Sequence, residues 1–504
     1  MLSPLIWAPI VGAALIGFWP TSDKDVECRV ATRSKWIALA VTSATLLWVI
    51  YLGSQFDLNT VGYQFEEDLP WLEPLGLRYK LGLDGLALIL VALNALLTDI
   101  SIYSSNRDLE RPQLYYSLLL LINAGVAGAF LAENVLLFFL FYELELIPLY
   151  LLIAAWGGPR REYAATKFLI YTAFSGILIL GVFLGLAWLS GSSSFDYQQL
   201  IHHALPLVQQ LVLLAGILVG FGIKIPLVPF HTWLPDAHVE ASTPISVLLA
   251  GVLLKLGTYG LLRFGLGLFP EAWRVLAPWL ATWAAISALY GALLAIAQTD
   301  MKKMVAYSSI AHMAYVLLAT AAATPLSVVA SILQMVSHGL ISALLFLLVG
   351  VVYSKTGTRD LNILRGLLNP ERGLPLIGSM MVLGVMASSG IPGMVGFIAE
   401  FLVFRGSFPV FPVQTLFCMV STGLTAVYFL LLVNRAFFGR LATGGKHLDA
   451  LQDELLPSTT WSDHAPGVIL AVLIVMLGLQ PNWMAVWTRT TADTLLLINT
   501  FGPT

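Results

Sequence analysis

Runs of about 20 apolar residues recur along the whole chain and alternate with short polar segments. Because an α-helix rises 1.5 Å per residue, each run can cross the roughly 30 Å hydrocarbon core of a bilayer. The pattern predicts an all-α polytopic membrane protein with about fourteen transmembrane helices in a single membrane domain, 1–504. The expected helices lie near 2–20, 34–54, 83–103, 113–131, 133–153, 163–188, 207–229, 242–263, 275–298, 303–323, 326–353, 373–404, 410–438 and 464–488.

Composition supports this interpretation and excludes several classes of function. Of the 504 residues, 58% are hydrophobic and 11% are charged, whereas roughly 25% of residues are charged in soluble proteins. An ordinary soluble enzyme is therefore excluded, and the net charge of −3 argues against nucleic acid as a partner. The sequence has no CxxC pair, His-rich tract or Gly-rich phosphate loop. We therefore expect no metal or cofactor in this chain and assign any redox chemistry to other chains.

Lysine and arginine are distributed unequally between alternate loops. Seventeen of them follow odd-numbered spans, whereas five follow even-numbered spans. Short cytoplasmic loops hold the excess of basic residues in membrane proteins. The asymmetry predicts that the loops after odd-numbered spans are cytoplasmic and that both termini lie on the opposite, non-cytoplasmic side.

Two lysines, Lys224 and Lys255, fall inside expected spans, where each costs on the order of 3 kcal/mol unless a partner, water or a function compensates. Candidate partners are Glu143 and Glu145 in the fifth span and Glu400 in the twelfth. Because Glu143 and Glu145 lie about 200° apart around a helix, only one of them can face a given interior. If Glu143 faces the bundle, Glu145 points elsewhere, at a neighbouring subunit or a second water path.

Prolines and glycines interrupt two of the spans. Four prolines occur in 224–244, and Gly390, Pro392 and Gly393 precede Glu400. Proline breaks a helix, and transporters place ion sites at such breaks within the membrane. We expect broken helices at spans 7 and 12. The two broken spans lie five helices apart, which predicts two repeats of five helices, and the odd helix number makes the repeats inverted in the membrane. The first repeat is helices 4–8 (113–263) and the second is helices 9–13 (275–438). A C-terminal helix, 464–488, follows.

Three histidines complete the candidate site. His312 and His338 lie in spans 10 and 11, and His231 lies beside the first break. Histidine gains or loses a proton near neutral pH, so His312 and His338 suit a proton relay, although buried hydrogen-bonded packing fits them equally well. His231 also fits a pivot of the broken helix. In chain order these groups have the composition of a lateral proton path.

Several long motifs carry a family resemblance that covers nearly the whole chain. They are GLDGLAL (82–88), YELELIPLYLL (142–152), ATKFLIYT (165–172), KIPLVPFHTWLPDAHVEA (224–241), LLAGVLLKLGTYGLLR (248–263), AYSSIAHM (306–313) and QMVSHGL (334–340). At these motifs the sequence resembles the antiporter-like proton-pumping subunits of complex I, specifically the chain 4 group, which share their fold with Mrp-type sodium/proton antiporters. The ELELIP doublet is most similar to the cyanobacterial and chloroplast version.

The resemblance implies that Glu143 pairs with Lys224, that Lys255 links this pair to the centre, and that Glu400 ends the path. It implies further antiporter-like membrane subunits, a peripheral redox arm and lipids as partners. Iron–sulfur clusters and quinone are expected in those partner subunits. The complex would pass electrons from ferredoxin or NAD(P)H to plastoquinone in a thylakoid membrane, in the standard respiratory or the CO2-uptake form.

Two rival readings remain. An Mrp-type antiporter without redox partners would use the same fold and lysines. A structural scaffold with inert buried ion pairs would predict no effect of replacing Lys255 or Glu400 on transport.

Overall fold

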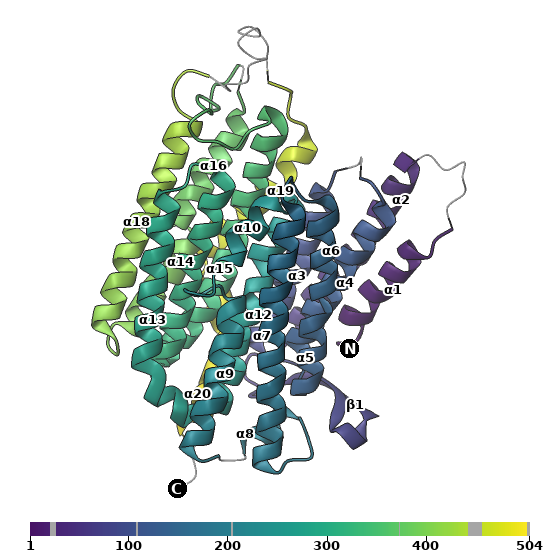
Figure 1. Cartoon of the computed structure of the whole chain (residues 1–504), viewed down its shortest axis with the longest axis vertical. Helices are drawn as coiled ribbons and strands as arrows, with labels where there is room; N and C mark the ends of the chain where they lie inside the picture. The colour runs from purple at the N-terminus through teal and green to yellow at the C-terminus, as the bar shows by residue number, and fades with distance from the viewer. Residues whose placement is uncertain (21–26, 107–108, 203–204, 372, 442–455, 501–504) are drawn as a thin grey trace.

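The computed structural model describes residues 1–20, 27–106, 109–202, 205–371, 373–441 and 456–500, and within these ranges it is mainly helical (Figure 1). Twelve helices or helix assemblies in the described ranges are long and apolar enough to span a membrane. Helices α1 and α16 are apolar but shorter, so the expected fourteen spans are reached only if both also cross. The first helices are α1 (Pro4–Gly17), α2 (Glu27–Gln55), α3 (Gly85–Ser104), α4 (Pro112–Leu131), α5 (Val135–Leu144), α6 (Leu146–Trp156) and α7 (Arg161–Ser190).

The remaining helices include both interrupted spans that the sequence predicts. The seventh span divides into α9 (Leu207–Lys224) and α10 (Trp233–Glu240), and the twelfth into α16 (Pro375–Ser388) and α17 (Val395–Ser407). Two prolines between α9 and α10, and one proline with two glycines between α16 and α17, prevent continuous backbone hydrogen bonding. The other elements are α8 (Tyr197–Ile201), α11 (Thr243–Leu248), η2 (Leu249–Leu253), α12 (Leu254–Gly260), η3 (Leu261–Leu266), α13 (Pro270–Ile296), α14 (Met301–Ala322), α15 (Pro325–Thr356), α18 (Pro412–Ala436), α19 (Trp461–Leu479) and α20 (Asn482–Thr500).

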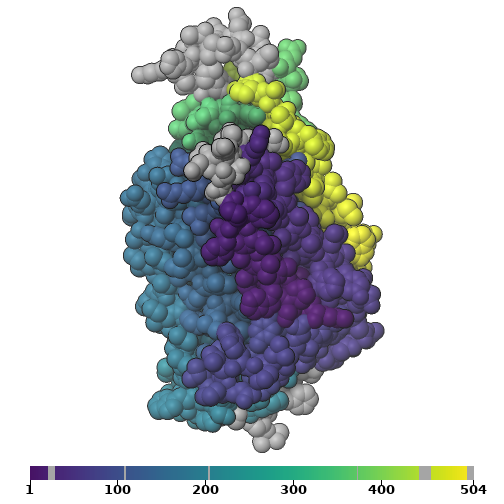
Figure 2. All heavy atoms as spheres, turned by 90° about the vertical axis from the view of Figure 1, so that its right-hand side faces the viewer, coloured from purple at the N-terminus to yellow at the C-terminus, as the bar shows by residue number. Residues whose placement is uncertain are grey.

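Two parts of the fold differ from the sequence-based expectation. An antiparallel hairpin joins α2 to α3 and consists of β1 (Gln64–Leu72) and β2 (Leu77–Leu83), linked by a single 3₁₀ turn, η1 (Glu73–Leu75). The expected C-terminal helix, 464–488, is two helices, because Pro481 separates α19 from α20. Figure 2 shows the N-terminal helices and the adjoining segments together on one face of the molecule.

The centre of the molecule is formed by the helices that carry the candidate residues. Residues 244–266 are all buried, and α14 and α15 are buried over most of their length. By contrast, α7, α13 and α18 expose many apolar side chains, such as Ile177, Trp279 and Leu430, as lipid-facing helices do. Side chains on the central helices therefore lie in a protein environment away from the lipid.

Four of the bases that predict the topology, Lys24, Arg107, Arg372 and Lys446, lie outside the described residues. The sidedness of the termini stays a prediction, as does the inverted relation between the two expected repeats.

Candidate functional site

The first group of the site is an ion pair between Lys224 and Glu145, both almost completely buried. Lys224 is the last residue of α9, and Glu145 lies at the junction of α5 and α6. Pro148 has no N–H to offer the carbonyl of Leu144, so the helix is interrupted at this junction. The ring of Tyr142 covers the lysine, with its centroid 4.6 Å from Nζ.

This geometry corrects the expected pairing of Glu143 with Lys224. Glu143 is half-buried, and its carboxylate makes no hydrogen bond or ion pair with any described residue; it lies against Gly176 on α7. The two glutamates have different neighbours, Gly176 on α7 for Glu143 and Lys224 on α9 for Glu145, and the sequence cannot say which of them lies inward. The inward carboxylate is that of Glu145.

Lys255 forms the second group. Its ammonium lies 2.5 Å from the carbonyl oxygen of Ala250 and 2.7 Å from Nδ1 of His338. Ala250 belongs to η2, a π-helical turn, and such turns are frequent at functional sites. Lys255 is completely buried, and no carboxylate lies within ion-pair distance of it in the described part of the chain. Gly257, two residues further on, packs directly against the Cβ of Lys224, so α12 and the end of α9 are in contact.

His312 and Glu400 form the third group. Nδ1 of His312 lies 3.1 Å from a carboxylate oxygen of Glu400, and its Nε2 lies 3.2 Å from the hydroxyl of Ser388. Thr422 donates to the other carboxylate oxygen at 3.1 Å. Glu400 is thus held in one orientation by groups from α14 and α18, immediately after the break between α16 and α17.

A small cavity, lined by both polar and apolar residues, joins the second and third groups. Its volume is about 10 Å³, close to what one water molecule requires. The rings of His312 and His338 line it with centroids 6.0 Å apart. The cavity is also lined by Ser308, Gln334, Ser337, Ser342, Ser388 and Glu400. Lys255, His338, His312 and Glu400 therefore form a nearly continuous polar row through the protein interior.

His231 is not part of this row. Its ring packs against Tyr290 at a centroid distance of 4.9 Å, and no hydrogen bond joins it to the other candidates among the described residues. It lies on the turn between α9 and α10, the position expected for a pivot. The sequence reasoning missed Ser388 and Thr422, because hydroxyl groups are too common in apolar helices to single out by pattern.

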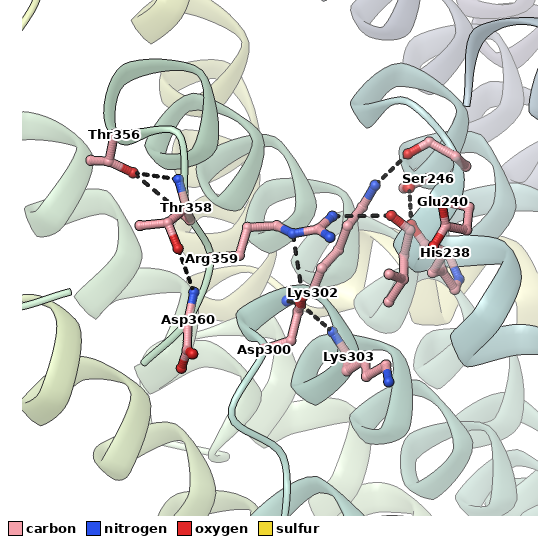
Figure 3. A network of polar contacts seen from close by, with 12 residues as sticks. His238, Glu240, Ser246, Asp300, Lys302, Lys303, Thr356, Thr358, Arg359 and Asp360 are labelled. Atoms are coloured by element: carbon pink, nitrogen blue, oxygen red, sulfur yellow. Dashed lines mark hydrogen bonds and ion pairs between the residues drawn. The ribbon is translucent and has the colours of Figure 1, made fainter. Parts of the chain in front are cut away.

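A separate network holds the end of α10 (Figure 3). Lys302 donates to the carbonyl of Ala241 at 2.6 Å, and Arg359 donates to that of Val239 at 3.0 Å. Arg359 also forms an ion pair with Asp300 at 3.3 Å. Positive side chains at the carbonyl end of a helix are favourable, so this network fixes the second half of the broken span to α14 and to the loop after α15.

Buried lysines, histidines and carboxylates on broken membrane helices define a class of protein, the cation-translocating membrane proteins of antiporter type. The family model described as "NADH:quinone oxidoreductase/Mrp antiporter, TM" matches residues 132–425, more than half of the chain. The chain belongs to this family.

Curated relatives and solved structures resemble nearly the whole chain. NAD(P)H-quinone oxidoreductase chain 4-2 of Synechocystis sp. is 40% identical over 87% of this chain and 78% of its own length. NAD(P)H-quinone oxidoreductase chain 4 1 of a Synechococcus sp. is 41% identical over 95% of this chain and 90% of its own. A chain of respiratory complex I from Thermus thermophilus matches with a TM-score of 0.86 and 26% identity over 99% of this chain and 100% of its own. A chain of the Mrp complex from a Dietzia species shares the fold, with a TM-score of 0.85 and 21% identity over 98% and 97% of the two chains.

Proposed function

We propose that this chain is a proton-translocating membrane subunit of a complex I-type NAD(P)H-quinone oxidoreductase, equivalent to chain 4 of its cyanobacterial relatives. The observation that carries the proposal is the buried row from Lys255 through His338 and His312 to Glu400. Relatives near 40% identity along most of the chain support the assignment to a quinone oxidoreductase.

The Lys224–Glu145 pair is the switch of the proposed mechanism. A proton from the cytoplasmic side loads Lys224 near the break between α9 and α10, and the neighbouring carboxylate favours the charged lysine. When the carboxylate and the lysine separate, Lys224 loses that stabilising charge and releases its proton toward Lys255. Each tenfold change in proton affinity corresponds to about 1.4 kcal/mol of driving force.

The histidines carry the proton from Lys255 to Glu400. Nδ1 of His338 accepts the proton of Lys255, and Nε2 of the same ring releases one into the small cavity. His312 takes up a proton at Nε2 and passes one from Nδ1 to Glu400. Each ring gains one proton and loses one, so its charge is restored, but the remaining proton then lies on the other ring nitrogen. A tautomer exchange or a ring rotation resets each histidine before the next proton passes. Glu400 then releases the proton to the opposite side of the membrane.

Electron transfer belongs to partner subunits in this proposal. The iron–sulfur clusters and the quinone site lie in those subunits, and a nicotinamide nucleotide or ferredoxin supplies electrons for plastoquinone reduction. The membrane is the thylakoid membrane, and both termini face the lumen. The complex is either the standard respiratory form or the form used in CO2 uptake.

A second candidate function is that of an Mrp-type cation/proton antiporter subunit without redox partners. The observation that favours it is the fold, which the Dietzia Mrp chain shares over 98% of this chain.

Purification of the tagged chain from native membranes in mild detergent tests the proposal. We expect co-purifying iron–sulfur and quinone-site subunits together with quinone reductase activity, and an additional CO2-hydration subunit would identify the CO2-uptake form. Small hydrophobic partners without redox activity would contradict the proposal and support the antiporter.

A further inference from the structure

An aromatic layer lies between Lys224 and the end of the molecule that carries the β1–β2 hairpin (Figure 1). The ring of Tyr142 covers the ammonium of Lys224 and stacks on Phe138 at a centroid distance of 5.5 Å. Phe138 in turn contacts Phe264 at 4.6 Å and Tyr259 at 6.1 Å. Aromatic rings therefore follow one another from the lysine toward the hairpin end, along α5 on one side and along α12 and η3 on the other.

The aromatic layer is packed too tightly to hold water. The side chains of Phe138, Phe221 and Phe264 are almost completely buried. The ring of Phe221 lies where a Cβ atom on Gly260 would be, so not even a methyl group fits between α9 and α12 at this point. Phe221 also contacts the rings of Tyr142 and Phe264, at centroid distances of 6.0 Å and 6.3 Å. Apolar constrictions of this kind exclude water from a membrane path.

The hydroxyl groups of the layer do not bridge it. Tyr142 shares a hydrogen bond with Ser175 at 3.1 Å, and Ser175 donates to the backbone carbonyl of Gly220 at 2.7 Å. Tyr259 donates to the backbone carbonyl of Phe130 at 3.1 Å. In the described part of the chain no hydrogen bond joins the two tyrosine hydroxyls. Because a proton moves only between groups within hydrogen-bond reach or through water, the layer offers it no continuous path.

Polar groups resume beyond the layer. The guanidinium carbon of Arg263 lies 5.4 Å from the centre of the Tyr259 ring, and Arg263 forms a buried ion pair with Asp84. Both charged residues line a cavity of about 110 Å³ together with Tyr63 and threonines of α20, and this volume has room for several water molecules. Asp84 directly follows β2, so the cavity belongs to the hairpin end. The aromatic layer thus separates two polar regions of the protein.

We propose that this aromatic layer is a proton barrier with Phe138 at its centre. A proton released by Lys224 cannot cross the layer to the hairpin end, so it moves sideways to Lys255. The barrier also prevents protons from flowing back through the first half of the chain. Phe138 acts by excluding water and does not bind the transported proton. The inference rests on the proposed proton translocation by this chain and adds the element that gives the path its lateral direction.

Passive proton leak through the intact complex, purified and reconstituted into liposomes, tests the barrier. A potassium diffusion potential drives protons inward without any electron donor, and an enclosed pH-sensitive dye reports their rate. Phe138→Ser removes the ring and adds a hydroxyl group, so water can enter the layer. We expect the leak to rise about tenfold, which corresponds to a barrier lower by about 1.4 kcal/mol. Phe138→Leu keeps the layer apolar and should leak like the wild type.

Phe168→Ser is the matched control for a lost buried ring. Phe168 is completely buried too, but its ring packs against Trp233 of α10 at 5.5 Å and not against the layer. We expect its leak to equal that of the wild type. Equal leaks in Phe138→Ser and Phe168→Ser would overturn the proposal. A Phe138→Leu complex that leaks as fast as Phe138→Ser would also overturn it, because loosened packing would then explain both.

Hydroxyl-radical footprinting of the wild-type complex does not depend on how well a variant assembles. Radicals formed from water label the side chains next to that water. We expect labelling of Tyr63, which lines the cavity, and protection of Phe138 and Phe264 in the layer. Labelling of Phe138 as strong as that of Tyr63 would overturn the proposal. A wild-type complex that reduces quinone without pumping would instead overturn the proposed function, whatever the leak and the labelling.

Discussion

Lys255 and His338 form a buried lysine–imidazole contact in which Nζ and Nδ1 are 2.7 Å apart. No carboxylate shares this contact in the described part of the chain, so the imidazole and the Ala250 carbonyl are the polar partners of the lysine. A lysine held by neutral groups can give up its proton more readily than one held in an ion pair. Lys255 is therefore suited to pass a proton on.

His338→Gln should separate relay from packing. The glutamine amide oxygen can still accept a hydrogen bond from Lys255, but it cannot take up a proton and release another. We expect the complex to assemble in normal amounts, seen on native gels, while proton pumping per quinone reduced falls about a hundredfold, the typical contribution of general acid–base transfer. Normal pumping would show that His338 serves only in packing.

Glu145→Gln and Glu143→Gln should differ in their effect on stability. Removal of one partner from a buried ion pair costs about 3–5 kcal/mol because the other charge remains unpaired. Glu145→Gln leaves the charge of Lys224 without its partner, whereas Glu143 makes no ion pair that its replacement could break. We expect a clear loss of thermal stability in the purified complex for Glu145→Gln and little loss for Glu143→Gln. The reverse order would favour Glu143 as the resting partner.

Glu400→Gln should stop proton transfer without disturbing the local fold. The glutamine can still accept a hydrogen bond from Thr422, which lies 3.1 Å from the carboxylate. It cannot accept the proton of His312, so pumping should be lost in the assembled complex. Thr422→Val is the matched control: it removes the contacts of the hydroxyl with Glu400 and Tyr315 but no ionisable group, and it should reduce pumping only severalfold. If Glu400→Gln pumps like the wild type, the row does not end at this residue.

Glu133 should make the stability of the protein depend on pH. It lies in the short turn between α4 and α5, where burial raises the pKa of its carboxyl to about 7, with Glu66 raising it further and Lys80, 3.6 Å away, opposing the shift. The folded protein therefore keeps a proton that the unfolded chain has lost between about pH 4.5 and 7. Stability from this group is fully present below pH 4.5 and is lost as the pH rises through 7.

Thermal unfolding of the wild type and Glu133→Gln at a series of pH values tests this expectation. The neutral glutamine should remove the pH dependence of stability that Glu133 causes. The melting temperature of the variant should therefore rise relative to that of the wild type as the pH goes from 5 to 8. A constant difference across that range would mean that Glu133 is ionised throughout.

The sequence predicts the helices and their breaks because both depend on local properties. Apolar runs set the spans, and Pro226 and Pro392 lie where the seventh and twelfth spans divide. Those signals say nothing of the rotation of a helix about its axis, so the choice between Glu143 and Glu145 depends on how α5 packs against α9. The β1–β2 hairpin and the separation of α20 from α19 also escape a pattern that is read only for long apolar runs.

In the candidate site, too, the sequence predicts the residue types but not their contacts. The residue types and their order along the chain indicate a row of proton-binding groups, and the structure brings Lys255, His338, His312 and Glu400 together. Their contacts involve α12, α14, α15 and α17, which are distant in sequence, so no spacing rule could predict which histidine meets which partner. The role of His231 in transport stays a prediction.

The ratio of protons pumped to quinone reduced, measured in native membrane vesicles from the wild type and from Lys255→Ala, tests the central claim most directly. In the proposed path Lys255 joins the Lys224 switch to the histidine row, so its loss would interrupt the path at its middle. The account predicts assembled complex and quinone reduction with a strongly reduced proton ratio. An unchanged ratio in Lys255→Ala would contradict the account, because protons would then cross without the buried row.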